Sequence, residues 1–364
     1  MSIKILHAAD FHLDSAFAGL TNEQARLRRR ESRQLLERLS NYVNQNAVDL
    51  VLLAGDLFDG TDTYRETVEQ LAEALGGMRA RVFIAPGNHD FYSARSPYAT
   101  LKWPENVHVF RTREIERVDL PELRCAVYGA AFTDAAQETS LLDGFAAPDD
   151  GAAHLMVLHA DLTAAGARYD PITREQIAAS NLDYLALGHT HRFGGVLTAG
   201  RTAYAYAGCP EGRGFDETGD KGVLCGTVGP GEVDIKFVPF AKRRYGVLRL
   251  DVTDRTPAEA LQSEMPETAA SDIFRVVFTG ETDERGVDIK SIEERFAPEF
   301  FHLEARDETR IRQDVWGRMR EDSLRGLFLK ELREKYDAAE DDGGRARIER
   351  AVRFGLAALD KRDM

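Results

Sequence analysis

The chain has 364 residues, 43% of them hydrophobic, which is enough for two domains because one core rarely serves more than about 250–300 residues. Its formal net charge is −14, from 61 acidic residues against 47 lysines and arginines. This balance excludes strong long-range attraction to nucleic acid or to an anionic membrane, so a local feature must attract any polyanionic partner.

The stretch "MSIKILHAADFHL" lacks the basic start, long apolar segment and cleavage site of a signal peptide, and no run approaches the roughly 18 apolar residues of a membrane span. We therefore expect a cytoplasmic protein. Cys125, Cys209 and Cys225 are odd in number, lie far apart and form no CxxC pair. They predict reduced, buried thiols, not a disulfide framework or a zinc site.

The first ~240 residues alternate apolar strands with helices. "IKILHAAD" predicts a strand that ends at Asp10, and residues 22–46 follow with a helix-spaced apolar stripe. "VDLVLLAGD" predicts the next strand, 64–78 a second amphipathic helix, and "RVFIAPGNHD" a third strand. Further strands are predicted in "RCAVYGAAF", "HLMVLHADL", "LDYLALGHTH" and "TAYAYAGCPE". Buried strands flanked by helices indicate an α/β sandwich, whose ligands bind beyond the strand ends.

The pattern changes in the last third of the chain. "YGVLRLDVT" and "IFRVVFTGE" predict strands, and the stretches 257–264 and 288–296 predict helices, which together indicate a small α+β domain. After it, "SLRGLFLKELREKY" and "RARIERAVRFGLAAL" predict two amphipathic helices around the turn "DAAEDDGGR". The predicted parts are 1–240, 241–310 and 311–364.

The strand ends of the first part carry side chains of the kinds that bind metals. They are Asp10, His12, Asp56, Asp59, Asn88, His89, Asp90, His159, His189 and His191. Imidazoles mixed with carboxylates suit Mn²⁺, Fe²⁺ or Zn²⁺ and match the all-oxygen shells of Ca²⁺ or Mg²⁺ poorly. In "DFH" and "GHTH", residues two apart project to one side of an extended backbone and reach one pocket. Asp56 is placed to bridge two ions about 3.5–4 Å apart.

In chain order the blocks read D-x-H, G-D-x-x-D, G-N-H-D, H and G-H-x-H. This series resembles the calcineurin-like metallophosphoesterase superfamily. "ILHAADFHLDSAF", "AGDLFDG", "APGNHDFY", "LALGHTH" and "YAGCPEGRGFDETGDKGV" are similar to SbcD-like DNA-repair exonucleases, particularly their YhaO-like branch. The resemblance implies an α/β fold with a four-layer-type β-sandwich core flanked by helices. In it, 1–240 would be the nuclease domain, 241–310 a small α+β capping domain and 311–364 a C-terminal helical segment.

The resemblance also implies a role for each residue of the site. One ion would be bound by Asp10, His12, Asp56 and His191, and the other by Asp56, Asn88, His159 and His189. His89 would face the scissile phosphate, as a charge stabiliser or proton donor, and Asp90 would orient its imidazole. Asp59 stands where some related nucleases have histidine. The implied reaction is direct hydrolysis by a hydroxide that the two metals activate, without a covalent intermediate.

The predicted function is metal-dependent hydrolysis of DNA phosphodiester bonds in DNA repair, as an exonuclease and also as a single-strand endonuclease. We expect two Mn²⁺ ions, with Fe²⁺, Zn²⁺ and Mg²⁺ as alternatives. The expected partners are DNA, an SMC- or ABC-type coiled-coil ATPase resembling SbcC that docks on the C-terminal helices, and a second copy of the chain.

Several alternatives stay open. The chain could be a metallophosphatase or phosphodiesterase for small nucleotides, or a non-enzymatic metal-binding scaffold for the ATPase. An unliganded His89 argues against the scaffold, because a structural metal site has no use for it. "RLRRRESR", residues 26–33, could bind backbone phosphates or form a solvated helix face, since Glu31 and Glu37 sit among its arginines. Phe11 and Phe91 could stack on a base or pack beneath the site.

Overall fold

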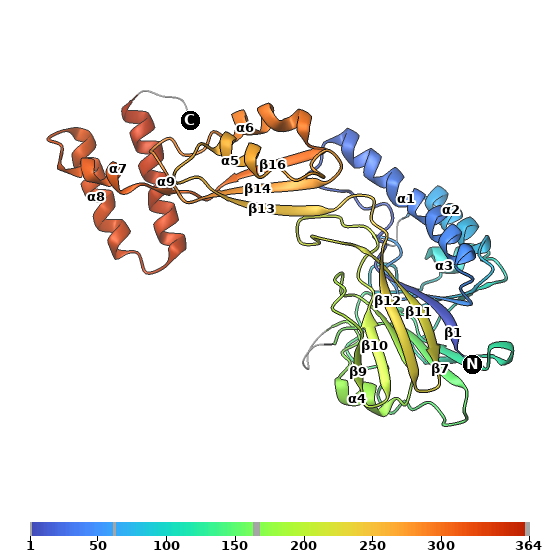
Figure 1. The fold of residues 1–364 in the computed structure, drawn as a ribbon. Helices are drawn as coiled ribbons and strands as arrows, with labels where there is room; N and C mark the ends of the chain where they lie inside the picture. Colours follow the sequence, from blue (N-terminus) through green and yellow to red (C-terminus); the bar gives the residue numbers. More distant parts are fainter. Residues whose placement is uncertain (1, 61–62, 163–167, 361–364) are drawn as a thin grey trace. The chain divides into compact units, whose positions relative to one another are not determined.

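The computed structural model describes residues 2–60, 63–162 and 168–360. The chain divides into two compact units, Met1–Arg244 and Tyr245–Met364 (Figure 1). None of the described helices combines the length and the apolar character that a membrane span needs. The three cysteines are buried and unpaired, as predicted.

The first unit contains two six-stranded sheets. The strands of the first sheet, in spatial order, are β12 (Glu232–Pro239), β11 (Gly222–Gly229), β1 (Ile3–Ala8), β2 (Leu50–Leu53), β3 (Arg81–Ile84) and β4 (Val107–Val109). Neighbours from β1 to β4 pair in parallel, whereas β11 pairs antiparallel with β1 and with β12. The almost continuous burial of β1, β2 and β3 is typical of parallel strands between two covering layers.

The second sheet also contains four neighbouring parallel strands. Its strands, in spatial order, are β5 (Glu116–Leu120), β6 (Cys125–Gly129), β7 (Ala153–His159), β8 (Tyr184–Gly188), β10 (Thr202–Tyr206) and β9 (Leu197–Ala199). The four central strands are parallel, and β5 and β9 pair antiparallel at the edges. The helices of this unit are α1 (Asn22–Gln45), α2 (Arg65–Gly76), α3 (Pro97–Thr100) and α4 (Arg174–Ala179).

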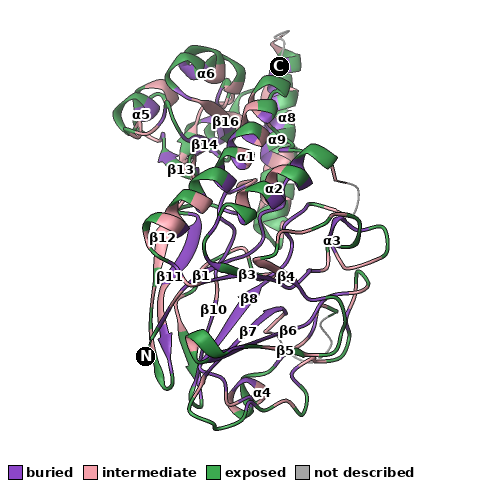
Figure 2. Cartoon of the chain, turned by 90° about the vertical axis from the view of Figure 1, so that its right-hand side faces the viewer, coloured by how far each residue is buried: buried purple, intermediate pink, exposed green. Residues whose placement is uncertain are grey.

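Alternate side chains of the first sheet enter two different cores. Leu6 and Val51 pack with the apolar stripes of α1 and α2, whereas Ile5 and Leu52 pack against the second sheet. The outer face of the second sheet packs with α4 through residues such as Leu185. Figure 2 shows the central strands of the two sheets buried and the outer faces of α1 and α2 exposed. The order helix, sheet, sheet, helix confirms the predicted four-layer α/β core.

The second unit begins with a parallel sheet of β-α-β connectivity. Its elements are β13 (Tyr245–Asp251), α5 (Pro257–Ser263), β14 (Ile273–Thr279), α6 (Ile289–Phe296) and β16 (His302–Asp307). The sheet order is β13-β14-β16, and both pairs are parallel. The sequence predicts all of these elements except β16. Val276, Phe278, Ile292 and Phe296 belong to the core under the two helices.

The C-terminal helices have a small core of their own, which includes Trp316, Leu329 and Val352. The elements here are β15 (Glu281–Thr282), β17 (Arg310–Ile311), α7 (Gln313–Gly317), α8 (Leu324–Ala338) and α9 (Asp342–Leu359). α9 begins within the predicted turn, because the Asp341 side chain accepts a hydrogen bond from the Gly344 N–H and caps the helix.

Candidate metal centre

The predicted ligands lie at the carboxyl ends of parallel strands from both sheets. Asp10, Asp56 and Asn88 follow β1, β2 and β3, whereas His159 is the last residue of β7 and His189 follows β8. Ligands bind at this edge in open α/β sheets, and here the two sheets present it together. The structure therefore brings together residues as far apart along the chain as Asp10 and His191.

Glycines allow the two edges to approach closely. A Cβ atom on Gly188 would overlap the carbonyl oxygen of Ala54, and one on Gly55 would lie 2.5 Å from Nδ1 of His159. Small residues before the ligands recur in the sequence, and the packing of the strand ends explains the glycines at these two positions.

Asp10, His12 and His191 form one group of donor atoms. One atom from each lies within 4.8 Å of the others. Nε2 of His12 is 3.2 Å from Nε2 of His191, which is 3.9 Å from Oδ1 of Asp10. Ligands of one transition-metal ion, each about 2.1 Å from it, lie roughly 3.0–3.5 Å apart. The group is therefore close to the geometry of a shared ion.

Asp10, Asp56 and His159 form a second group within 4.8 Å. Nε2 of His159 is 2.9 Å from Oδ1 of Asn88 and 3.4 Å from Oδ2 of Asp56. The same Oδ2 atom is 3.8 Å from Nε2 of His12, which belongs to the first group. Asp56 thus faces both groups, in the position predicted for a bridging carboxylate.

His189 lies beside the second group. Its ring centroid is 5.2 Å from that of His159, and its Nε2 is 3.8 Å from Oδ2 of Asp161. Its backbone N–H donates to both carboxylate oxygens of Asp10, at 3.1 and 3.2 Å. His189 is absent from the donor groups that the described residues form, so its predicted role as a ligand stays a prediction.

Three of the histidines have a hydrogen-bond acceptor at Nδ1. The pairs are His12 with Oδ1 of Asp59 at 3.1 Å, His159 with the Ala54 carbonyl at 3.0 Å, and His191 with Oε1 of Glu217 at 2.7 Å. A carbonyl or an ionised carboxylate only accepts, so Nδ1 carries the proton and Nε2 carries a lone pair in the neutral ring. Burial lowers the pKa of His12 to about 4, which keeps this ring neutral at pH 7.

With these tautomers, the Nε2 atoms are hydrogen-bond acceptors that face other acceptors. The lone pairs of His12 and His191 face each other, and that of His159 faces the amide oxygen of Asn88. Buried acceptors that converge without a proton between them repel one another unless a cation lies between them. Imidazole nitrogens combined with carboxylate and amide oxygens therefore fit divalent transition-metal ions.

The two central carboxylates differ in pKa. Burial and the neighbouring Asp56 raise the pKa of Asp10 well above its usual range. Burial acts in the same direction on Asp56, but the imidazoles of His159, His12 and His89 outweigh it and lower its pKa. Two buried carboxylates that oppose each other's ionisation are the kind of pair that a bound cation stabilises.

His89 is exposed at this site. Its ring meets the ring of His12 edge to face, with centroids 4.9 Å apart, and its backbone N–H donates to Oδ1 of Asp56 at 2.9 Å. One of its ring nitrogens lies within 4.8 Å of donor atoms of His12 and Asp56. The imidazole therefore reaches the metal-binding groups while it stays accessible to a substrate.

Asp90 does not orient His89, and that prediction is corrected. It is fully buried, and its Oδ2 accepts from the N–H groups of Leu57 and Phe58 and from the hydroxyl of Tyr98. No hydrogen bond or ion pair joins the side chains of Asp90 and His89 in the part of the chain that the structure describes. Asp90 instead ties the loop after β3 to the loop after β2, and so fixes the loops that carry Asn88 and Asp56.

Two carboxylates support the ligands from outside the donor groups. Asp59 accepts from His12, so in this chain the carboxylate that replaces histidine positions a ligand. Glu217 does the same for His191 and is buried. The sequence analysis gave Glu217 no role, although "GFDETGDKG" belongs to a stretch that carries the family resemblance.

Several of these residues have left-handed backbone conformations. The φ angles are 54° at Asp10, 43° at His12, 51° at Asp56 and 106° at His189. Residues other than glycine rarely adopt this conformation, and each one that does lowers the stability of the fold by about 1–2 kcal/mol. The surrounding core therefore holds the ligands in conformations that the local sequence disfavours.

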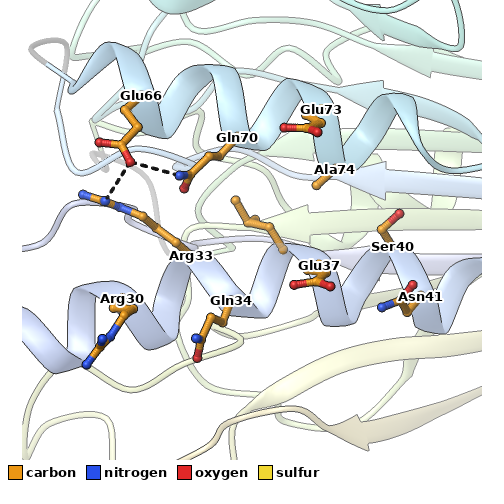
Figure 3. A pocket seen from close by; sticks show the side chains of 11 residues that line it. Arg30, Arg33, Gln34, Glu37, Ser40, Asn41, Glu66, Gln70, Glu73 and Ala74 are labelled. Atoms are coloured by element: carbon orange, nitrogen blue, oxygen red, sulfur yellow. Dashed lines mark hydrogen bonds and ion pairs between the residues drawn. The ribbon is translucent and has the colours of Figure 1, made fainter.

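At the arginine-rich start of α1, Arg26 and Arg30 are exposed, as a solvated helix face predicts, whereas Arg28 fits neither predicted alternative. The Arg28 side chain is fully buried, 2.9 Å from Glu31 and 2.9 Å from Glu211, whereas Arg26 is exposed. Arg30 and Arg33 line a groove of about 620 Å³ between α1 and α2, where Arg33 points toward Glu66 (Figure 3). None of the predicted ligands lines this groove, so it is separate from the metal centre.

The two phenylalanines next to the ligands differ in burial. Phe11 is buried in the core under α1 and α2, which favours the packing role. Phe91 is partly exposed, so the alternative of stacking on a base stays open for it.

A family model described as calcineurin-like phosphoesterase matches residues 3–193, more than half of the chain. The chain belongs to this family. The matched range contains all seven predicted ligands and His89. Metallophosphoesterases of this family bind divalent metals, in agreement with the clustered aspartates and histidines.

Curated relatives of this metallophosphoesterase agree with the predicted resemblance. "Uncharacterized metallophosphoesterase YhaO" of Bacillus subtilis (strain 168) is 30% identical over 73% of this chain and 67% of that protein. The SbcD component of the nuclease SbcCD of the same organism is 26% identical over 63% of this chain and 67% of that protein. Its counterpart from Rhodobacter capsulatus is 28% identical over 54% of this chain and 50% of that protein.

Proposed function

We propose that this metallophosphoesterase is a DNA exonuclease that hydrolyses phosphodiester bonds with two bound Mn²⁺ ions. The observation that carries the proposal is the convergence of histidine nitrogens and carboxylates around Asp56, with the accessible His89 beside them. Relatives named as a subunit of the nuclease SbcCD support a nucleic acid as the substrate.

The residues of the site would have different roles in this reaction. When bound, two divalent ions supply an activated water and neutralise the non-bridging oxygens of the phosphate. Asp10, Asp56 and the histidines would hold those ions at the strand ends, where Asp10, His12, Asp56 and His159 are buried. His89 is free to stabilise negative charge on the phosphate or to protonate the leaving oxygen. Among divalent ions, Mn²⁺, Fe²⁺ and Zn²⁺ suit mixed nitrogen and carboxylate ligands, and we place Mn²⁺ first.

A second candidate is hydrolysis of small nucleotides or other short phosphoesters. The net charge of −14 favours it, since an acidic chain attracts a polyanion less than it attracts a small ester. For the same reason, DNA cleavage by the isolated chain should fall steeply as salt concentration rises.

The deciding assay offers Mn²⁺ with end-labelled single- and double-stranded oligonucleotides and, in parallel, with bis-p-nitrophenyl phosphate. We expect cleavage of both, with removal of terminal nucleotides. His89→Ala should lower the rate about 10²–10⁴-fold, because proton transfer and charge stabilisation are lost. Its Mn²⁺ binding should persist, and His108→Ala, on β4, should behave as wild type. Hydrolysis of only the small ester would support the second candidate, and no hydrolysis with any divalent metal would leave a scaffold.

We also propose that α8 and α9 dock on a coiled-coil ATPase of the SMC type. Leu324, Leu327 and Phe354 are 68%, 68% and 60% exposed, which is unusual for large apolar side chains of a folded protein. Replacing Leu324 and Leu327 by lysine should abolish copurification with such an ATPase from the same organism. Glu334→Lys, an equally exposed change to lysine on α8, should leave it intact.

A further inference from the structure

The loop between β10 and β11 lies beyond the residues that the family model matches, yet it contacts the metal centre. Within the loop, Arg213 and Glu217 form an ion pair at 2.9 Å, and the carboxylate of Glu217 is only 4% exposed. Oε1 of Glu217 also accepts the Nδ1–H of His191 at 2.7 Å. A guanidinium nitrogen of Arg213 also lies 3.1 Å from this Nδ1 atom, but the contact with the carboxylate of Glu217 is shorter, and it places the proton of this predicted ligand on Nδ1.

The loop holds the backbone of His191 as well as its ring. Nζ of the buried Lys221 donates to the His191 carbonyl oxygen at 2.9 Å, and the N–H of Cys209 reaches the same oxygen at 3.5 Å. A Cβ atom on Gly208 would lie 3.2 Å from this oxygen, so the loop also packs tightly there. A shift or rotation of His191 would therefore break contacts at its ring nitrogen Nδ1 and at its backbone carbonyl oxygen.

Arg213 extends this support to a second ligand. Its other terminal nitrogen is 3.1 Å from Oδ1 of Asp59, the atom that accepts the Nδ1–H of His12. A single guanidinium, 19% exposed, therefore links the two carboxylates that orient His12 and His191. A planar guanidinium with several fixed donors suits such a bridge, whereas a lysine ammonium lacks that geometry.

The second donor group is supported differently. Nδ1 of His159 donates to the backbone carbonyl of Ala54, and Asn88 lies on the loop that Asp90 ties down. No residue of 209–221 takes part in these contacts among the described residues. The histidines of the two donor groups therefore depend on separate supporting contacts.

We infer that Cys209, Arg213, Glu217 and Lys221 form a clamp that positions His191 and His12 and sets the affinity for one of the two ions. The inference rests on the proposed two-ion centre. Arg213 and Glu217 are positioning residues, since they act through the imidazoles. Loss of a residue that orients a metal-binding histidine typically costs 10–100-fold in metal affinity, so we expect about that effect at one ion only.

The test is a Mn²⁺ titration of the full chain, in which calorimetry and electron paramagnetic resonance measure the binding. The variants are Glu217→Ala, Glu217→Gln and Arg213→Met, with exposed Asp216→Asn as the matched control. Wild type should bind two ions and show a spin-coupled spectrum. Glu217→Ala should bind one ion unchanged and the other about 10–100-fold more weakly, with an uncoupled spectrum at intermediate Mn²⁺. Glu217→Gln keeps an acceptor and should partly restore the coupled spectrum.

Circular dichroism melting of the metal-free proteins shows whether each variant is folded. If Glu217→Ala does not fold, Arg213→Met, at a partly exposed position, decides by the same criteria. Two ions with unchanged affinity in the folded variants would overturn the clamp and leave the proposed function standing. Failure of wild type to bind two ions would overturn the proposed two-ion centre and the clamp with it.

Discussion

Asp170 is a buried carboxylate that the metal centre does not use. Its Oδ1 accepts from the N–H of Leu141 at 2.7 Å, whereas its Oδ2 is buried without a hydrogen-bond partner among the described residues. Burial raises its pKa from 3.8 to about 7. The folded protein therefore keeps a proton that the unfolded chain releases at lower pH.

This proton predicts a pH dependence of stability. Between the two pKa values the folded state binds more protons, so the free energy of unfolding should fall as pH rises, by up to about 1.4 kcal/mol per pH unit. Asp170→Asn should remove this contribution, so the variant gains on wild type between about pH 5 and about pH 8. Urea denaturation at both pH values measures it, with the exposed Asp143→Asn as control. A constant difference between Asp170→Asn and wild type would contradict the prediction.

At the scale of residues, the sequence predicted which side chains lie close together better than it predicted their supporting contacts. Asp10, His12 and Asp56 could be predicted because strand ends and residue types are local features. The partners of Asp90 and Glu217 depend on how two loops meet in the folded chain. The pattern "GNHD" places Asp90 beside His89, but the structure turns it toward Leu57 and Tyr98.

The strand ends depend on glycine, which leads to a prediction for the element β8. Gly188→Ala would press a methyl group against the carbonyl of Ala54 on the other sheet. We expect a loss of about 1–3 kcal/mol in the free energy of unfolding and weaker metal binding, because the two sheets must separate. Gly194→Ala, where an added Cβ meets nothing within 4 Å, is the matched control. Urea denaturation and Mn²⁺ titration measure the two effects, and unchanged metal affinity in Gly188→Ala would contradict the second.

The anchoring of α1 gives a second prediction at this scale. Arg28→Met removes the cation that lies between buried Glu31 and Glu211. Glu31 keeps Arg243 and Glu211 keeps Arg38, so the free energy of unfolding should fall by about 1.5–3 kcal/mol, the contribution of hydrogen bonds between charged groups. Arg26→Met, an exposed change on the same helix, should stay within about 0.5 kcal/mol of wild type. Equal denaturation midpoints for the two variants would show that the buried pair contributes nothing.

Periodicity located α1 and α2 but could not show which arginines are buried. Arg28 and Arg26 look alike in the sequence, and the difference arises because Glu211, 183 positions away, meets Arg28. Similarly, the start of α9 depended on the Asp341 cap, which outweighed the glycines after it. Local pattern thus predicts that a helix exists, whereas its boundaries and buried charges depend on particular contacts.

At the scale of the whole molecule, the metal centre and the clamp lie within the first unit, which has its own cores. We therefore predict that a fragment of residues 1–244 unfolds cooperatively, binds Mn²⁺ and hydrolyses bis-p-nitrophenyl phosphate at a rate close to that of the full chain. Thermal melting, calorimetry and the ester assay measure this. A folded fragment without hydrolysis would show that the second unit contributes to the chemistry.

The left-handed φ angles at Asp10, His12 and Asp56 have a consequence for how such a sequence can change over time. Glycine would relieve each of them, so a change that abolishes the chemistry could make the metal-free fold more heat-resistant. Selection for stability alone would then replace these aspartate and histidine residues one at a time. A chain that keeps aspartate and histidine in these conformations therefore gives up stability of its metal-free fold for the chemistry of those side chains.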